Sequence, residues 1–193
     1  MSFFNLKEIK VENNSTLSDI EIRKLLAPIY DKNLIFLDTL QIEKLLYQSN
    51  LIKGFDIKKK YPNVLTVNIY EKKPIAILQI KKKKFYLSEE IELIKFNSFH
   101  NYENLPYVFG NQEDFKNFYK DLNKIDFPIN LIKKYILYDS NRWDLETIDK
   151  KIIKLPTKNY LKSLKNFQNL RDKKEFIKHK IFDYRINNQL ILK

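Results

Sequence analysis

In the first part of the chain, apolar and polar residues alternate with a period close to two in two stretches, one near residue 6 and one from residue 57 onward. Leu6, Ile9 and Val11 alternate loosely with charged residues, which predicts a strand. From Ile57 onward the alternation is clearer. One side of the predicted strand carries Leu65, Val67 and Ile69, and the other carries Thr66, Asn68 and Tyr70. Pro62 and Asn63 predict a turn that divides this stretch into two strands.

A short helix is predicted after the first strand, because the residues of a capping box precede it. The Ser18 side chain can accept from the Glu21 amide, and the Glu21 side chain can accept from the Ser18 amide. Leu17, just before the cap, can pack on Ile22. The helix is expected to end near Ala27, since Pro28 follows. Its expected apolar face consists of Ile20, Ile22, Leu25 and Leu26.

The same capping pattern occurs a second time and predicts a second short helix. Asp38 is the expected cap and Gln41 its box partner, ahead of the apolar Leu45 and Leu46. The predicted order is therefore strand, helix, helix, strand, strand.

The rest of the chain reads as strands with charged turns and two longer helices. Residues 81–94 predict a strand pair, and residues 105–110 a strand that ends on Gly110 before a helix with Phe115, Phe118, Tyr119 and Leu122 at helical spacing. A hairpin containing Trp143 and a further helix follow, and two terminal strands are expected around residues 180–186 and 189–193. Trp143 is expected in the core beside Leu145.

The sequence around the predicted 57–76 hairpin resembles the POTRA module of the bacterial division proteins FtsQ/DivIB. The residues that carry the resemblance are Ile57, Lys58, Lys59, Pro62, Leu65, Val67, Ile69, Glu71, Pro74 and Ala76. Upstream, Asn13 stands where the family usually has glycine, and asparagine tolerates a positive φ better than other non-glycine residues. Three later stretches, at 105–110, 142–147 and 181–185, also resemble the family pattern, so the resemblance covers nearly the whole chain.

The resemblance implies an α+β fold in two domains. Residues 1–73 would form a βααββ POTRA-like domain, and residues 74–193 a mostly antiparallel β-sheet domain with flanking helices.

Composition excludes several kinds of chemistry. The chain has 193 residues and no cysteine, which rules out a disulfide scaffold, a thiolate nucleophile and a cysteine metal cluster. Glycine occurs only at Gly54 and Gly110, so no phosphate-binding loop of the Walker or dinucleotide type can be written. His100 and His179 show no metal-ligand spacing. We therefore expect no catalytic residue, cofactor, metal or small-molecule substrate.

The net charge of +12 raises nucleic acid as a partner, but only four of the 36 basic residues are arginine. Abundant lysine indicates a general compositional bias, and the run Lys81 to Lys84 fits a solvated hairpin turn. A basic nucleic-acid-binding domain remains an alternative function. So does a POTRA module that guides polypeptides toward an outer-membrane barrel.

The function implied by the resemblance is that of a non-enzymatic scaffold for septum assembly. The family relation implies the partners FtsB and FtsL and other membrane-embedded division proteins. It also implies a single upstream membrane helix, absent from this chain, that tethers this region on the periplasmic side of the inner membrane at the septum. No membrane-length apolar run occurs within the chain itself.

The same resemblance places partner binding at the terminal strands. The partner would add as a further strand along a sheet edge there. The expected site residues are Arg185, Ile186, Gln189, Leu190, Ile191 and Leu192. Arg185 has two interpretations at this stage. It is either available for a partner carboxylate or held by an intramolecular acid such as Asp183.

Overall fold

The computed structural model describes residues 3–97, 99–186 and 188–193. The chain divides into two compact units, one comprising Met1–Lys73 with Asn97–Asn101 and the other Pro74–Phe96 with Tyr102–Lys193. Helices and strands are mixed in both, which confirms the α+β class. That residues 1–73 and 74–193 act as separate domains stays a prediction.

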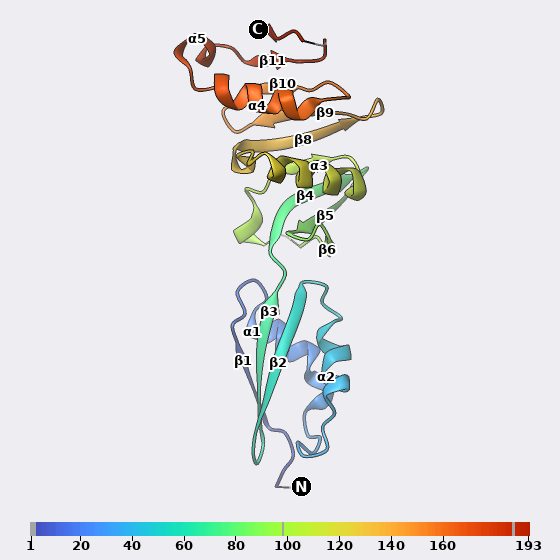
Figure 1. The fold of residues 1–193 in the computed structure, drawn as a ribbon. Helices are drawn as coiled ribbons and strands as arrows, with labels where there is room; N and C mark the ends of the chain where they lie inside the picture. The colour runs from blue at the N-terminus through green and yellow to red at the C-terminus, as the bar shows by residue number, and fades with distance from the viewer. Residues whose placement is uncertain (1–2, 98, 187) are drawn as a thin grey trace. The chain divides into compact units, whose positions relative to one another are not determined.

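The first unit is a three-stranded sheet with two helices (Figure 1). Its elements are β1 (Glu8–Glu12), α1 (Asp19–Leu25), the 3-10 turn η1 (Ala27–Ile29), α2 (Thr39–Leu46), β2 (Ile52–Lys60) and β3 (Val64–Glu71). The predicted order of elements is confirmed. The strands lie in the order β1-β3-β2, with β1 parallel to β3 and β2 antiparallel to it.

The predicted helix caps are confirmed, with one correction. Ser18 and Glu21 form the reciprocal capping box of α1. Asp38 caps α2 by accepting from the Leu40 amide at 3.1 Å. The return bond expected from Gln41 is not found in the part of the chain that the structure describes, because Asp38 bonds one residue earlier than a capping box requires.

Ile20 was expected on the buried face of α1, and this was wrong, since it is 79% exposed. Ile22 and Leu26 lie one turn apart and are both fully buried. Ile20 is two residues from Ile22, about 200° around the helix, and therefore faces solvent. The helix also ends at Leu25, slightly earlier than predicted, where the 3-10 turn with Pro28 begins.

The alternation predicted for β3 is confirmed on its buried side, where Leu65, Val67 and Ile69 are fully buried. On the other side Thr66 is only 6% exposed, although it was expected to face outward with Asn68 and Tyr70. β3 is the central strand, so Thr66 is flanked on that face by its register partners Lys10 of β1 and Lys58 of β2.

Asn13 has a φ of 62° and donates from its side chain to the Ile69 carbonyl at 3.0 Å. The position that favours glycine in the family is thus left-handed here too, as the sequence predicted.

The second unit is a nine-stranded sheet in the order β12-β11-β10-β9-β8-β7-β4-β5-β6. Its strands are β4 (Pro74–Ile80), β5 (Lys83–Ser88), β6 (Leu93–Lys95), β7 (Tyr107–Phe109), β8 (Ile132–Tyr138), β9 (Arg142–Thr147), β10 (Ile152–Lys154), β11 (Ile181–Asp183) and β12 (Ile191–Leu192). Its helical elements are α3 (Gln112–Lys124), η3 (Ile129–Leu131), α4 (Tyr160–Leu170) and α5 (Lys174–Ile177), while the short η2 (His100–Tyr102) falls at the boundary of the two units. Three neighbouring pairs, β10/β11, β8/β7 and β7/β4, are parallel and the others are antiparallel, so the sheet is mostly antiparallel as predicted.

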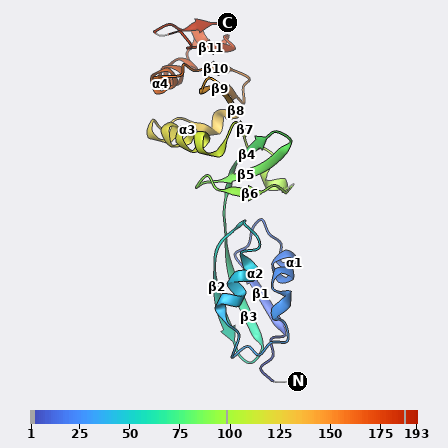
Figure 2. The ribbon, with the colours of Figure 1, turned by 90° about the vertical axis from the view of Figure 1, so that its right-hand side faces the viewer.

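Helices α3 and α4 cover one face of this sheet (Figure 2). Phe115 and Phe118 of α3 and Phe167 of α4 are buried against it. Trp143 is 6% exposed and stacks on Phe118 with ring centroids 4.8 Å apart, which confirms its predicted core position. The opposite face of β8 to β11 is covered by neither α3 nor α4, and we call it the helix-free face.

Candidate functional site

The last two strands form a hairpin at one margin of the nine-stranded sheet. β12 pairs with β11 alone and stands first in the strand order. Both strands are shorter than the predicted residues 180–186 and 189–193. The Gln189 amide donates to the Ile186 carbonyl at 3.2 Å, so the chain turns between the two predicted strands, as a hairpin requires.

The backbone bonds of the hairpin determine which groups face the open margin. Ile181 and Lys193 exchange both bonds, with N to O distances of 3.0 and 3.1 Å. The next pair, Phe182 and Leu192, is then a pair without mutual hydrogen bonds. The N–H and C=O of Leu192 therefore point away from β11, toward the position that another strand would occupy.

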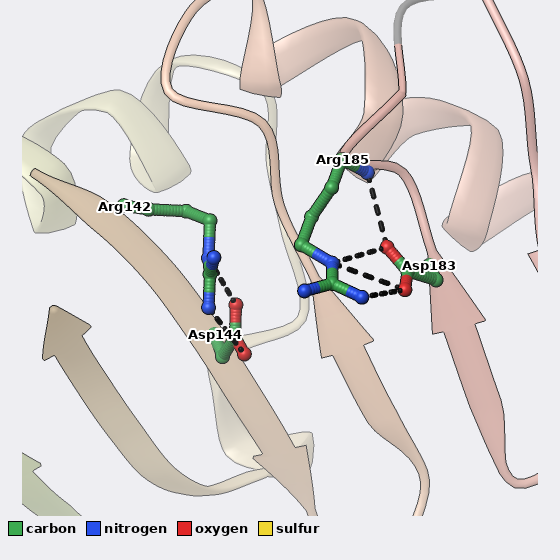
Figure 3. Close-up of polar contacts among 4 residues, drawn as sticks. All are labelled: Arg142, Asp144, Asp183 and Arg185. Atoms are coloured by element: carbon green, nitrogen blue, oxygen red, sulfur yellow. Dashed lines mark hydrogen bonds and ion pairs between the residues drawn. The ribbon is translucent and has the colours of Figure 1, made fainter. Parts of the chain in front are cut away.

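Arg185 follows β11 and forms an ion pair with Asp183 (Figure 3). Of the two interpretations open from the sequence, the intramolecular pair is formed. The guanidinium bonds lower the pKa of the Asp183 carboxyl from its ordinary value, and partial burial opposes them. The Arg185 side chain is nevertheless 45% exposed, so it keeps donors on the solvent side.

A second pair, Arg142 with Asp144, lies beside the first (Figure 3). The Arg142 guanidinium also sits 4.4 Å from the centre of the Tyr138 ring. Burial raises the pKa of Asp144, and the hydrogen bond from Arg142 acts against it.

Lys154 connects the two pairs across the sheet. It is the register partner of Asp144 on β9 and of Asp183 on β11, so the three residues form one row on the helix-free face. Its positive charge favours the ionised form of both carboxyls, although burial still raises the pKa of Asp144 overall. Negative, positive and negative side chains therefore alternate across β9, β10 and β11, next to the open edge at β12.

A cavity of about 700 Å³ lies between α4 and the segment that leads into β12. Ile186, Gln189 and Leu190 form part of its lining, together with Tyr160 and Asn166 of α4. Tyr184 donates to the Asn166 side chain at 2.9 Å, which links the two walls. The six predicted residues thus gather at one margin: three at the cavity, Ile191 and Leu192 on the edge strand, and Arg185 on the face.

Sequence reasoning missed Arg142 and Lys154. A signal was present, because Arg142, Asp144 and Glu146 alternate with the buried Trp143 and Leu145 and so share the outer face of one strand. What the sequence could not supply was the register that places Lys154 between two acids.

No group of histidine or acidic side chains that could hold a metal ion is found among the described residues. None of the helices in that part of the chain has the length and apolar character needed to cross a bilayer.

The first unit is a three-stranded sheet carrying two helices, and the second is a nine-stranded sheet with β12 at its margin. Residues 4–72 match the family model described as POTRA domain, FtsQ-type. The chain is 27% identical over 168 residues to the cell division protein FtsQ of Rickettsia bellii, covering 84% of this chain and 61% of the relative. It is 25% identical to FtsQ of Rickettsia conorii over 194 residues, covering 96% and 71%. With FtsQ of Agrobacterium fabrum it is 25% identical over 163 residues, covering 83% and 51%.

These matches confirm the resemblance to the FtsQ/DivIB family. The chain spans 61% of the length of the first of these relatives. The activities and partners of these full-length relatives are therefore only proposals for this chain.

Proposed function

We propose that this chain is the extracytoplasmic part of a non-enzymatic division scaffold, and that it docks FtsB and FtsL by strand addition at β12. In this proposal an upstream membrane helix tethers it to the inner membrane at the septum, with this region on the periplasmic side. The observation that carries the proposal is the outward orientation of the Leu192 backbone groups at a margin with one neighbour.

The open edge is short, so backbone bonds alone give limited affinity. Each added hydrogen bond contributes about 0.5 to 1.5 kcal/mol net, and β12 has two residues. Side-chain contacts must therefore set the choice of partner.

Arg185 and Arg142 supply such contacts for acidic partner residues. Both guanidinium groups are held in place by their own aspartates, which reduces the side-chain entropy lost when a partner carboxylate binds. The cavity beside α4 can receive an apolar side chain from the partner, because Ile186 and Leu190 form part of its wall.

Co-purification of residues 1–193 with the periplasmic parts of FtsB and FtsL tests the proposal. Arg185→Glu should weaken capture by about tenfold or more, since it places a like charge against the partner's acid. Deletion of residues 189–193 should abolish capture. Lys82→Glu makes a like charge reversal in the exposed β4–β5 turn and should leave capture unchanged.

Unchanged capture in both site variants would refute the docking edge. Absence of capture by the unaltered chain would refute FtsB and FtsL as its partners. The first unit is proposed to supply a second contact surface, with other membrane-embedded division proteins as its partners.

A further inference from the structure

Four exposed apolar side chains gather at one end of the first unit. Phe3, Ile35, Phe36 and Tyr61 are 73%, 43%, 82% and 57% exposed. Single exposed apolar residues are ordinary on soluble proteins, whereas a group assembled from three separate segments indicates an interaction surface. We call these four residues the aromatic tip.

Backbone bonds hold the three segments of the tip together. The Leu34 amide donates to the Phe4 carbonyl at 2.8 Å, and the Lys7 amide to the Asn63 carbonyl at 2.9 Å. The Phe4 ring meets Tyr61 edge-on, with centroids 6.3 Å apart. The N-terminal residues, the loop before α2 and the β2–β3 turn accordingly lie at the same end of the unit in both views (Figures 1 and 2).

Lysines surround the tip. Lys7, Lys32 and Lys60 are exposed, and in the part of the chain that the structure describes none of them forms an ion pair. Lys32 lies beside the N-terminal segment, since its carbonyl accepts from the Leu6 amide at 2.9 Å, and Lys60 directly precedes Tyr61. Asp31 is exposed beside Lys32, but the three lysines outnumber it, so a partner that combines negative charge with an apolar layer fits this end.

We propose that the aromatic tip inserts into the interface of an anionic lipid bilayer. Aromatic side chains concentrate at the headgroup level, where their rings enter the apolar boundary. Each lysine close to an anionic leaflet contributes about 1 kcal/mol of attraction, and the flexible stem lets the ammonium reach the phosphates. The inference rests on the proposed function in one respect: an upstream membrane helix would join the chain at this end.

Flotation of residues 1–193 with vesicles tests the proposal. The chain should bind vesicles containing phosphatidylglycerol, bind vesicles of phosphatidylcholine alone much more weakly, and release as salt is added. The double variant Phe3→Ser/Phe36→Ser should lower the bound fraction by about tenfold, as expected for two lost aromatic anchors. Lys60→Glu should lower it by about fivefold or more, because it removes an attraction and adds a repulsion.

Matched controls come from α1. Ile20 is 79% exposed, and Lys24 is exposed on the same helix. Glu71 is the last residue of β3, at the end opposite the tip, and its carboxylate accepts from the Leu17 amide just before α1. α1 therefore begins at the end of the unit away from the tip. Ile20→Ser and Lys24→Glu should therefore bind vesicles like the unaltered chain.

A fluorescence reporter makes the result independent of any loss of folding. The emission of Phe36→Trp should shift to the blue when phosphatidylglycerol vesicles are added, and that of Ile20→Trp should not; the buried Trp143 contributes the same emission to both variants. Equal vesicle binding by the tip variants and the controls would overturn the proposal. So would a loss of self-association in the tip variants without any change in vesicle binding, which would assign the tip to a second copy. Neither readout depends on FtsB or FtsL, so failure of the docking proposal leaves this test intact.

Discussion

Arg185 donates from its guanidinium to both carboxylate oxygens of Asp183, at distances of 2.6 to 3.1 Å. The Arg185 backbone amide donates to the same carboxylate at 3.1 Å. Asp183 is the last residue of β11, so this contact fixes the direction in which the chain leaves the strand toward β12. The charged group proposed to meet a partner therefore also shapes the edge that the partner would join.

The Asp183 carboxyl should titrate below its ordinary pKa of 3.8, because Arg185 stabilises its charged form. Arg185→Gln should raise that pKa, whereas Arg23→Gln, which removes an exposed pair in the first unit, should not. Carbon-detected NMR titration of the aspartate carboxyls gives the answer. Since the folded pKa is the lower one, the pair's contribution to the free energy of unfolding should be complete above the ordinary pKa and decline as the pH falls through the folded value.

The Glu71 carboxylate should stabilise the turn between β1 and α1 by accepting hydrogen bonds from its amides. Its carboxylate accepts from the amides of Ser15, Thr16 and Leu17 at 3.2, 2.8 and 2.9 Å. Burial raises the pKa of Glu71, but these bonds outweigh it and the pKa is lowered. Glu71→Gln should reduce the free energy of unfolding at neutral pH by about 1 to 3 kcal/mol, because one accepting oxygen is replaced by an NH2 donor and the bonds to the other lose their charge.

Urea unfolding followed by circular dichroism measures this effect. The unaltered chain should lose stability as the pH falls below about 5, where the unfolded state takes up a proton that the folded Glu71 does not. Glu71→Gln should show a flatter dependence. Glu12→Gln, an exposed acid on β1, should behave as the unaltered chain; an equal effect in both variants would contradict the role of Glu71.

The two glycines should respond differently to an added methyl group. A Cβ at Gly110 would lie 3.0 Å from the Leu137 Cβ and 3.3 Å from Trp143 Cη2, whereas a Cβ at Gly54 would meet Tyr70 at an ordinary 3.8 Å. Gly110→Ala should destabilise the second unit by about 1 to 3 kcal/mol through overpacking. Gly54→Ala should be neutral or slightly stabilising, since the strand loses a flexible residue. Thermal unfolding of both variants compares them, and an equal change in Tm would contradict the packing around Gly110.

Local patterns predicted the elements well, because caps and periodicity depend on neighbours in the sequence. Ser18 with Glu21, the alternation of Leu65, Val67 and Ile69, and the core position of Trp143 are confirmed. Ile20 was misplaced because an apolar residue at a helix start fits several rotations of so short a helix. Its rotation is set by packing on the sheet.

The site was less predictable, since it depends on pairing between strands that are distant in the sequence. The resemblance pointed to the terminal strands, and the hairpin lies at a margin. Lys154, however, gains its neighbour Asp144 through the antiparallel pairing of β10 with β9, and its neighbour Asp183 through the parallel pairing of β10 with β11. No local pattern specifies that register. The two terminal strands are also shorter than predicted, at Ile181–Asp183 and Ile191–Leu192.

Amide exchange at Leu192 most directly tests strand addition at β12. In the free chain its N–H points to the open margin and should exchange rapidly with solvent, while the Lys193 amide, bonded to Ile181, should exchange more slowly. When the periplasmic parts of FtsB and FtsL bind, the Leu192 amide should slow by about a hundredfold or more as it gains a strand partner. Saturating binding that leaves Leu192 exchange unchanged would contradict docking at this edge.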